Sequence, residues 1–304
     1  MKRLTLLVIL VLGALGLTYG LYSASQPTGP FAELELKLAP LAQALEKPRP
    51  GDWLDKYPEA GQTFAEYLRA NPVRRDAQRH TIYLCLLGDF TPEQQRIMDV
   101  TRAYLEVYFD APVKIQRRVP LEQVPDHARR KHPNWGDAQI LSTYVLEQLL
   151  QPDRPADALA YVAFTASDLW PGPGWNFVFG QASLQERTGV WSIYRFGDPA
   201  ASPAEYQRCL VRTLRVATHE TGHILTMHHC TAYQCNMNGS NSLPESDRRP
   251  MHLCPVCLRK LCWNLNVQPT PYLTRLRDFC TKHDLTAEAE WYGKALTALE
   301  KADR

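Results

Sequence analysis

A twelve-residue segment, HETGHILTMHHC (residues 219–230), limits what this chain can fold into more than any other part of the sequence. It lies at the end of a predicted helix over residues 202–227. His219 and His223 are four residues apart, so both imidazoles project from one face of that helix, with Glu220 beside the first. Two imidazoles suit zinc and an adjacent carboxylate suits the proton transfers of zinc-dependent hydrolysis. The segment therefore predicts a catalytic metal site, with a solvated helix face as the alternative.

The residues after the second histidine favour a third ligand from a sharp turn. His229 lies six residues beyond His223, where a helix that ends and turns back can present another imidazole to the same metal. Three histidines leave one zinc position open, as in catalytic zinc sites. His228 is an alternative third ligand, but the spacing favours His229. This is the metzincin pattern except that Thr226 replaces the usual glycine. Because a β-branched residue resists the left-handed conformation, we expect this turn to be built differently.

Four of the eight cysteines form a second metal-ligating pattern. A pair spaced CxxxxC is followed after eighteen residues by a pair spaced CxxC, which is typical of a structural four-thiolate zinc site. The four are Cys230, Cys235, Cys254 and Cys257. Because Cys230 directly follows His229, we expect the structural zinc to hold the turn that presents the third catalytic ligand. The alternative is a pair of disulfides, which thiols outside the cytoplasm tend to form.

Apolar periodicity predicts strands that alternate with helices over the centre of the chain. Thr91 and Ser202 are each followed by proline and then by apolar residues at helical spacing, which predicts two capped helices. The expected strands are 80–88, 112–119, 158–166, 175–183 and 189–196, and the expected helices are 60–70, 91–109, 137–151, 202–227, 273–285 and 288–301. Such alternation indicates an α/β or α+β layered core.

Residues 1–25 have the features of an export segment. Lys2 and Arg3 precede an apolar stretch over residues 4–22, and small residues follow it. This pattern predicts a cleaved signal peptide or a retained membrane anchor through residues 4–22, with the rest of the chain outside the cytoplasm. The formal net charge is +2 and Lys and Arg form no long run, so the composition argues against nucleic acid as a partner.

The combined signature resembles the archaemetzincin family. The resemblance rests on HETGHILTMHHCTAYQCNM followed by GSN, DRRP and CPVCLRKL, and it extends to GDWLDKYPEAGQTFAEYLRANP, IYLCLLGDF and FVFGQAS. These segments look more like the eukaryotic branch than the short archaeal one. The resemblance implies a metzincin-like catalytic domain with a twisted mixed sheet, packed helices, an active-site helix and a small C-terminal zinc-bound lobe.

The resemblance also implies roles for individual residues. His219, His223 and His229 match the catalytic zinc ligands, and Glu220 matches the general base. Met237 matches the methionine of the Met-turn beneath the metal, although by itself it would be interpreted as a core methionine. The four cysteines match a second zinc site, so two zinc ions per chain are expected.

We expect four parts in the chain. They are a signal peptide or anchor over 1–25, a lead-in over 26–77, the metzincin-like zinc peptidase domain over 78–285, and a helical C-terminal extension over 286–304. Among the other cysteines, Cys85 is expected to be a buried apolar residue, and Cys262 and Cys280 are a candidate disulfide. Cys209 has no predicted role.

The expected function is hydrolysis of peptides or small proteins by a zinc-activated water, with Glu220 as the general base. The resemblance suggests cleavage near the amino end, and residues 175–183 are a candidate edge for an extended peptide. Two other classes stay open. Thr226 raises the option of a noncatalytic zinc-scaffolded peptide-binding protein. The CxxC of Cys254 and Cys257 raises that of a cell-envelope redox or metal-handling protein. The sequence does not indicate the oligomeric state.

Overall fold

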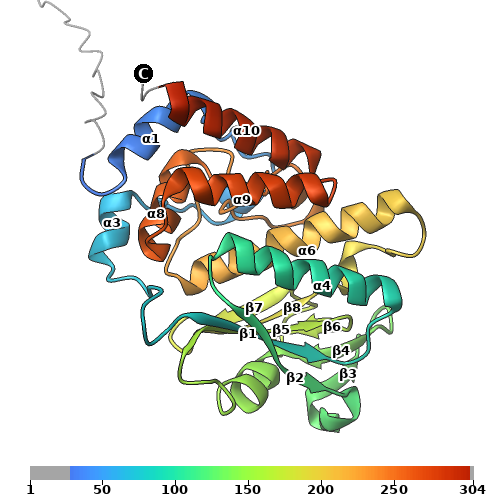
Figure 1. Cartoon of the computed structure of the whole chain (residues 1–304). Helices are drawn as coiled ribbons and strands as arrows, with labels where there is room; N and C mark the ends of the chain where they lie inside the picture. Colours follow the sequence, from blue (N-terminus) through green and yellow to red (C-terminus); the bar gives the residue numbers. More distant parts are fainter. Residues whose placement is uncertain (1–27, 302–304) are drawn as a thin grey trace, which may run out of the picture.

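The computed structural model describes residues 28–301, and within them a mixed five-stranded sheet forms the centre (Figure 1). The strand order is β2-β1-β5-β8-β7, in which β7 is antiparallel at one edge and the other neighbours are parallel. A smaller sheet has the order β3-β4-β6. The strands are β1 Thr81–Leu87, β2 Val113–Val119, β3 Arg129–Lys131, β4 Ala138–Leu141, β5 Ala158–Thr165, β6 Asp168–Trp170, β7 Gly180–Ser183 and β8 Thr188–Ser192.

Helices cover both faces of this sheet. On one face α4 and α6 pack together, with α9 and α10 beyond them, and a helical segment over 142–150 lies against the other face (Figure 1). The helices are α1 Ala32–Leu38, α2 Trp53–Lys56, α3 Phe64–Arg69, α4 Pro92–Tyr108, α5 Ser142–Tyr144 continuing as a π-helix Val145–Leu150, α6 Pro203–Ile224, α7 Leu243–Asp247, α8 Pro255–Leu265, α9 Pro269–Lys282 and α10 Thr286–Lys301. This arrangement confirms the predicted mixed α/β fold class.

The strand β1 shows why the sheet is covered on both sides. Every residue of β1 is buried. Ile82, Leu84 and Leu86 join the large apolar core under the helices, whereas Tyr83, Cys85 and Leu87 join a second core on the opposite face. Successive side chains of a strand point to opposite faces, so a continuous apolar strand of this kind requires cover on both. Cys85 is a buried core residue, as predicted.

The two capped helices begin where the sequence predicts. Thr91 caps α4, and its hydroxyl accepts a hydrogen bond from the Gln94 backbone N–H at 3.2 Å. Ser202 caps α6 in the same way, because its Oγ accepts from the Glu205 N–H at 3.2 Å. Each cap satisfies a backbone donor that would otherwise have no partner in the first turn. The result is a fixed start for the long helix that carries the histidines.

Three predicted elements differ in the structure. The prediction of a single helix over residues 137–151 is wrong, since Ala138–Leu141 forms β4 and helical structure begins only at Ser142. β4 pairs with β3 and β6, and the buried Gln139 side chain donates to Asp168 Oδ2 at 2.7 Å, so tertiary pairing overrides local propensity. The two expected strands over 175–183 and 189–196 are shorter and reduce to β7 and β8.

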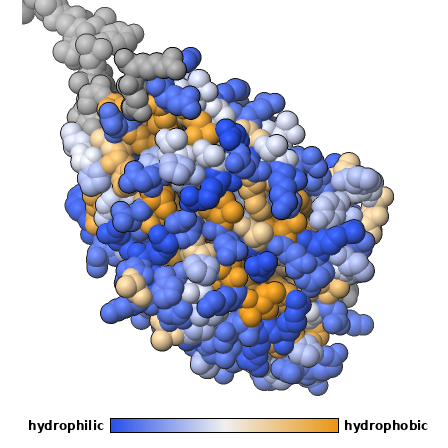
Figure 2. Space-filling view, in the orientation of Figure 1, coloured by the Kyte–Doolittle hydropathy of each residue, from blue (hydrophilic) through white to orange (hydrophobic). Residues whose placement is uncertain are grey.

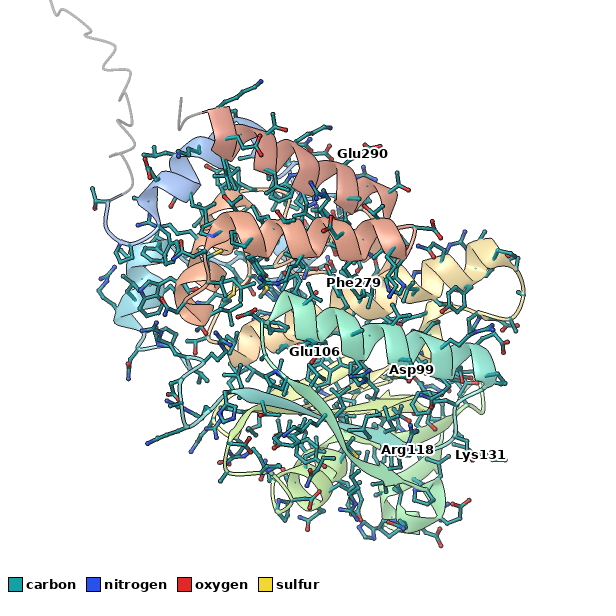
Figure 3. The ribbon with its side chains drawn as sticks, viewed as in Figure 1. Asp99, Glu106, Arg118, Lys131, Phe279 and Glu290 are labelled. Atoms are coloured by element: carbon teal, nitrogen blue, oxygen red, sulfur yellow. The ribbon has the colours of Figure 1, made fainter. Side chains whose placement is uncertain are left out.

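The C-terminal helices are packed onto the core. In α10, Tyr292, Leu296 and Leu299 are buried and belong to the large core, while Glu290 points outward (Figure 3). Phe279 of α9 lies against Tyr104 of α4, with ring centroids 5.1 Å apart. The face that includes these helices is largely hydrophilic, with separate apolar areas (Figure 2). Helix α10 is therefore packed on the protein and not solvated on all sides.

The predicted export segment, residues 1–25, lies outside the described residues. Within residues 28–301, no helix combines the length and the apolar character that crossing a membrane requires. The lead-in is held in place by α1, which packs on α8 and α10. Arg259 of α8 donates to Glu35 of α1 at 2.7 Å.

Candidate metal centres and active-site cleft

Helix α6 places His219 and His223 side by side. Their Nε2 atoms are 3.0 Å apart, and both side chains are half-buried. The Nδ1 of His219 donates to the Asn236 carbonyl at 2.7 Å, and the Nδ1 of His223 donates to the Met227 carbonyl at 2.6 Å. Because carbonyl oxygens only accept, the ring proton lies on Nδ1 and the Nε2 lone pair is free. Both imidazoles therefore aim a metal-ligating atom at the same point.

The third histidine of the group is His229. Its ring lies 4.8 Å from that of His223 and 5.4 Å from that of His219, measured between centroids. Its Nδ1 donates to Glu59 Oε2 at 2.8 Å, so its Nε2 is also free. His228, the alternative ligand, is exposed and uses its backbone N–H to contact Gln62. The structure therefore brings His229, and not His228, together with His219 and His223.

The turn between His223 and His229 is left-handed, and the expectation of a different turn is wrong. Thr226 has φ +70° and its N–H donates to the His223 carbonyl at 2.7 Å. The left-handed region costs a β-branched residue on the order of 1 kcal/mol or more. Contacts from the lead-in offset this, because the Val73 N–H donates to Thr226 Oγ1 at 3.1 Å and Gln62 Nε2 donates to the Thr226 carbonyl at 3.2 Å. The Thr226 hydroxyl therefore accepts a hydrogen bond that a glycine at this position could not accept.

The three histidines fit a divalent metal. One ligand atom from each lies within 4.8 Å of the others. Burial, together with the neighbouring histidine side chains, lowers the pKa of His219 to about 4 and that of His223 to about 3. Both rings are therefore neutral near pH 7, the form that binds zinc. The oxygen acceptors behind each Nδ1 fix the ring orientations, as is usual for zinc-bound histidine.

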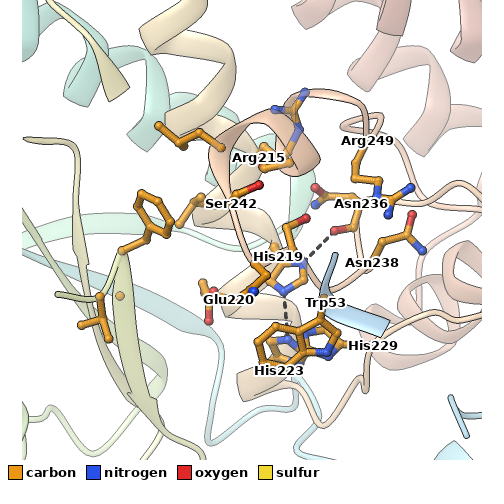
Figure 4. A pocket seen from close by; sticks show the side chains of 18 of the residues that line it. Trp53, Arg215, His219, Glu220, His223, His229, Asn236, Asn238, Ser242 and Arg249 are labelled. Carbon is orange, nitrogen blue, oxygen red and sulfur yellow. Dashed lines mark hydrogen bonds between the residues drawn. The ribbon is translucent and has the colours of Figure 1, made fainter. Parts of the chain in front are cut away.

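Glu220 follows His219 on α6 and lines the same cleft. Figure 4 shows its carboxylate beside the histidines. Burial raises the pKa of Glu220 above its ordinary value. A carboxylate with a raised pKa exchanges protons more readily near neutral pH than an exposed one. Its position and its pKa direction are those of a residue that accepts and returns a proton.

The four predicted cysteines form a second buried group. One sulfur from each lies within 4.8 Å of the others, and all four are free thiols, which contradicts the alternative of two disulfides. The Cys235 Sγ accepts hydrogen bonds from the Met237 N–H at 3.4 Å and the Cys254 N–H at 3.3 Å. Such bonds stabilise a thiolate, and contacts with the neighbouring thiols lower the pKa of Cys230. The group fits a structural zinc. Cys262 and Cys280 are free as well.

Met237 lies between the two groups. A Cβ on Gly222 of α6 would come within 2.8 Å of the Met237 sulfur, so the methionine packs directly under the helix at a position that only glycine leaves open. The Met237 carbonyl accepts from the Cys230 N–H at 2.7 Å. Met237 thus contacts both α6, next to His223, and the backbone of Cys230, while its role as a Met-turn residue stays a prediction.

The histidines open into a cleft of about 510 Å³ (Figure 4). One wall is formed by residues 177–180, which lead into the edge strand β7. The opposite wall contains Asn236 and Asn238 from the loop after the third histidine. The cleft is therefore an open groove beside the three imidazoles and has the size of a ligand site.

The lead-in contributes two site residues that have no assigned role in the sequence-based prediction. Trp53 Nε1 donates to Glu59 Oε1 at 2.9 Å, and the indole ring lies 5.1 Å from the His229 ring. Both residues fall in the segment GDWLDKYPEAGQ, which contributed only to the overall resemblance. A lone carboxylate far from the histidines in sequence carries no signal of contact. Asn238, also missed, donates to the Cys230 carbonyl at 2.6 Å.

The comparisons with known proteins agree with this geometry at the level of class. Residues 148–262 match the model of Peptidase family M54. The matched segment contains α6, all three histidines and all four cysteines. The fold and the site thus define a protein of a peptidase class.

Relatives that match over a longer region define the family. Archaemetzincin-2 of Pongo abelii is 34% identical over 245 residues, which cover 70% of this chain and 67% of the relative. Archaemetzincin-2 of Homo sapiens is 32% identical over 244 residues, with the same coverage of 70% and 67%. The crystal structure of the archaemetzincin of Methanopyrus kandleri aligns with a TM-score of 0.50 at 29% identity, over 63% of this chain and 98% of that one. The chain belongs to the archaemetzincin family.

Proposed function

We propose that the protein is a zinc-dependent peptidase that hydrolyses peptide bonds in the cleft beside α6. The observation that carries this proposal is the convergence of three imidazoles on one point, with Glu220 next to that point in an open cleft. Membership of a peptidase family supports the reaction class. Bound zinc supplies a Lewis acid that polarises the peptide carbonyl and makes water nucleophilic at neutral pH.

The remaining steps belong to the protein. Glu220 accepts the proton of the attacking water and returns it to the nitrogen of the leaving amine. The hydrogen bonds from His219, His223 and His229 to their oxygen acceptors keep the imidazoles oriented throughout. An extended peptide would pair with backbone groups of the edge strand β7, whose first residue, Gly180, lines the cleft.

The test is the substitution Glu220→Gln. We expect this variant to keep its zinc and to lose peptide hydrolysis by about 100-fold or more, the usual contribution of a general base. The matched control is Glu205→Gln, which changes an acidic residue in the first turn of the same helix, far from the histidines along α6. Full activity in the Glu220→Gln protein with normal zinc would contradict the assignment.

Two zinc ions per chain are proposed, one at the histidines and one at the four cysteines. The four thiols are each at most 8% exposed, which does not favour a redox role in which they exchange with a partner disulfide. Elemental analysis of protein purified without chelator measures the count directly. One zinc or none, with normal folding, would contradict the proposal.

Three further points are proposals as well: that the protein cleaves peptides near their amino end, that it belongs to the eukaryotic-type branch of the family, and that it is exported. Cleavage near a free α-amine would be lost when the peptide is acetylated, which a comparison of free and acetylated peptides by mass spectrometry detects. Location outside the cytoplasm rests on the sequence of residues 1–25 alone. Cell fractionation with and without those residues tests it, since an export signal is required for the full-length protein to leave the cytoplasm.

A further inference from the structure

Two buried arginines line the cleft on the side away from His223 and His229. Arg215 is 8% exposed and Arg249 is 9% exposed, and both border the same cavity as His219 and Glu220. Figure 4 shows both side chains at the opposite end of the cavity from His223 and His229. Arg215 precedes His219 by four residues, so it lies on the same face of α6 about 6 Å further along the axis. Nothing in the proposed hydrolysis uses either arginine.

The guanidinium of Arg215 is poorly satisfied by the protein. Its Nε and Nη1 atoms are buried and have no hydrogen-bond partner. Two acids face it: Asp247, whose Oδ1 is 3.6 Å from Arg215 Nη1, and Glu288, whose oxygens already contact the Met251 N–H and His252 Nδ1. Arg212 already donates to both oxygens of Asp247, at 3.0 and 2.5 Å. A buried cation with unused donors is unfavourable, so the site favours an added anion.

Arg249 is only partly satisfied. Its Nη2 donates to Glu245 at 3.2 Å, but its buried Nε has no partner. Glu245 also accepts from the backbone N–H groups of Trp53 and Asn241, so its charge is shared among several donors. Among the described residues that line the cleft, the acidic side chain is Glu220. Glu245 and Asp247 offset charge at this end of the cleft, but three buried guanidinium N–H donors of the two arginines still have no hydrogen-bond partner.

We propose that Arg215 and Arg249 form a subsite that binds a carboxylate of the peptide substrate. The ligand is an aspartate or glutamate side chain or the C-terminal carboxylate. Arginine suits this role because its planar fork binds a carboxylate through two parallel hydrogen bonds. The inference rests on the proposed peptidase function, because it assigns a substrate preference to the same cleft.

The test measures binding with the full-length, zinc-loaded Glu220→Gln protein, so that no probe is cleaved. Dye-labelled peptides carry glutamate or glutamine at one position, moved stepwise along the peptide, with the C-terminus free or amidated. We expect one glutamate position, or the free C-terminus, to tighten binding by about 10- to 100-fold in fluorescence anisotropy. The amidated set distinguishes the side chain from the terminus. Equal binding of all these peptides would overturn the proposal.

Substitutions then assign the preference to the arginines. Arg215→Gln should reduce it to about twofold or less, whereas Arg208→Gln, an exposed arginine on the same helix, should leave it unchanged. Arg249→Gln is a second test, and zinc content with circular dichroism shows that each variant is folded. A preference that both folded variants retain would overturn the subsite. If Arg215→Gln and Arg249→Gln do not fold, the comparison of acidic and neutral peptides bound to the Glu220→Gln protein still tests whether the cleft prefers a carboxylate.

Failure of this inference is distinguishable from failure of the peptidase proposal. Hydrolysis of neutral and acidic peptides at equal rates, with equal binding, removes the subsite and leaves the peptidase. Selective binding of acidic peptides by the Glu220→Gln protein, with no hydrolysis by the parent protein, supports the subsite and removes the peptidase.

Discussion

His229 shows how a single residue depends on a distant part of the chain. Its partner Glu59 lies 170 positions earlier in the sequence. The spacing from His223 favoured His229 over His228, and the structure brings His229 together with the other two imidazoles, because these residues belong to one helix and the turn after it. Glu59 was not predictable, since a hydrogen bond between segments so far apart leaves no local pattern. The position of Arg215 on the histidine face of α6 could have been predicted from the sequence, because it continues the four-residue spacing of His219 and His223.

Substitution of Glu59 tests its effect on the metal. We expect Glu59→Gln to weaken zinc binding at the histidines by about 10- to 100-fold, because the carboxylate behind a ligating histidine raises its basicity and fixes its orientation. Competition with a chelator measures this affinity. Glu46→Gln, an exposed acid of the same lead-in, is the control. Unchanged affinity in the Glu59→Gln protein would show that the contact with His229 has no role in metal binding.

Thr226 allows strain and hydrogen bonding to be separated. Thr226→Val keeps the β-branched strain and removes the acceptor for the Val73 N–H, so it should lower the free energy of unfolding by about 1–3 kcal/mol. Thr226→Gly removes the same hydrogen bond but also the strain, so its net effect should be about 1 kcal/mol or less. Urea unfolding measures both. A valine variant as stable as the parent would show that the Val73 contact contributes nothing.

At the scale of elements, local signals predicted the helices well where their ends are encoded in the sequence. Thr91 and Ser202 each provide a capping hydroxyl, and α4 and α6 begin where these residues predict. Residues 137–151 carry helical periodicity throughout, yet their first part forms β4. The pairing of β4 with β3 and β6 depends on strands that the periodicity of 137–151 does not contain, so the error is one of tertiary context.

The two metal groups share a backbone element, since His229 and Cys230 are adjacent. Elemental analysis should give about two zinc ions per chain, and His229→Ala should lose one of them with the fold retained. Cys254→Ser should lose zinc and lower the melting temperature, because the substitution leaves the buried four-thiolate site with only three of its ligands. Cys85→Ser, a change at a buried cysteine outside the group, is the control for burial alone. Normal zinc and stability in the Cys254→Ser protein would contradict a structural site.

At the scale of the whole molecule, α10 is connected to the core by a buried charge. Glu288 accepts from the Met251 N–H at 2.9 Å and lies 2.9 Å from His252 Nδ1. Burial by itself would raise the pKa of Glu288, but these contacts and the charge of Arg215 outweigh it, and the net effect lowers the pKa. The carboxylate therefore favours the folded state when it is ionised.

The direction of this pKa shift predicts acid sensitivity. A lowered pKa in the folded protein means that Glu288 contributes stability above its unfolded pKa of about 4.3 and that this contribution is lost as the pH falls below it. We expect the urea midpoint of the parent protein to fall more steeply between about pH 5 and pH 3 than that of Glu288→Gln. Glu290→Gln, an exposed neighbour on the same helix, should behave like the parent. Identical pH profiles for the parent and Glu288→Gln would contradict the prediction.

The contacts of the lead-in with the active-site turn affect how the protein can be divided for expression. A fragment cut to the segment that matches the peptidase family, residues 148–262, contains every predicted metal ligand. It lacks Glu59, the Val73 N–H and the central strand β1. Such a fragment would carry the complete signature but neither the partner of His229 nor the support of the left-handed turn. Recombinant boundaries should therefore begin upstream of Trp53.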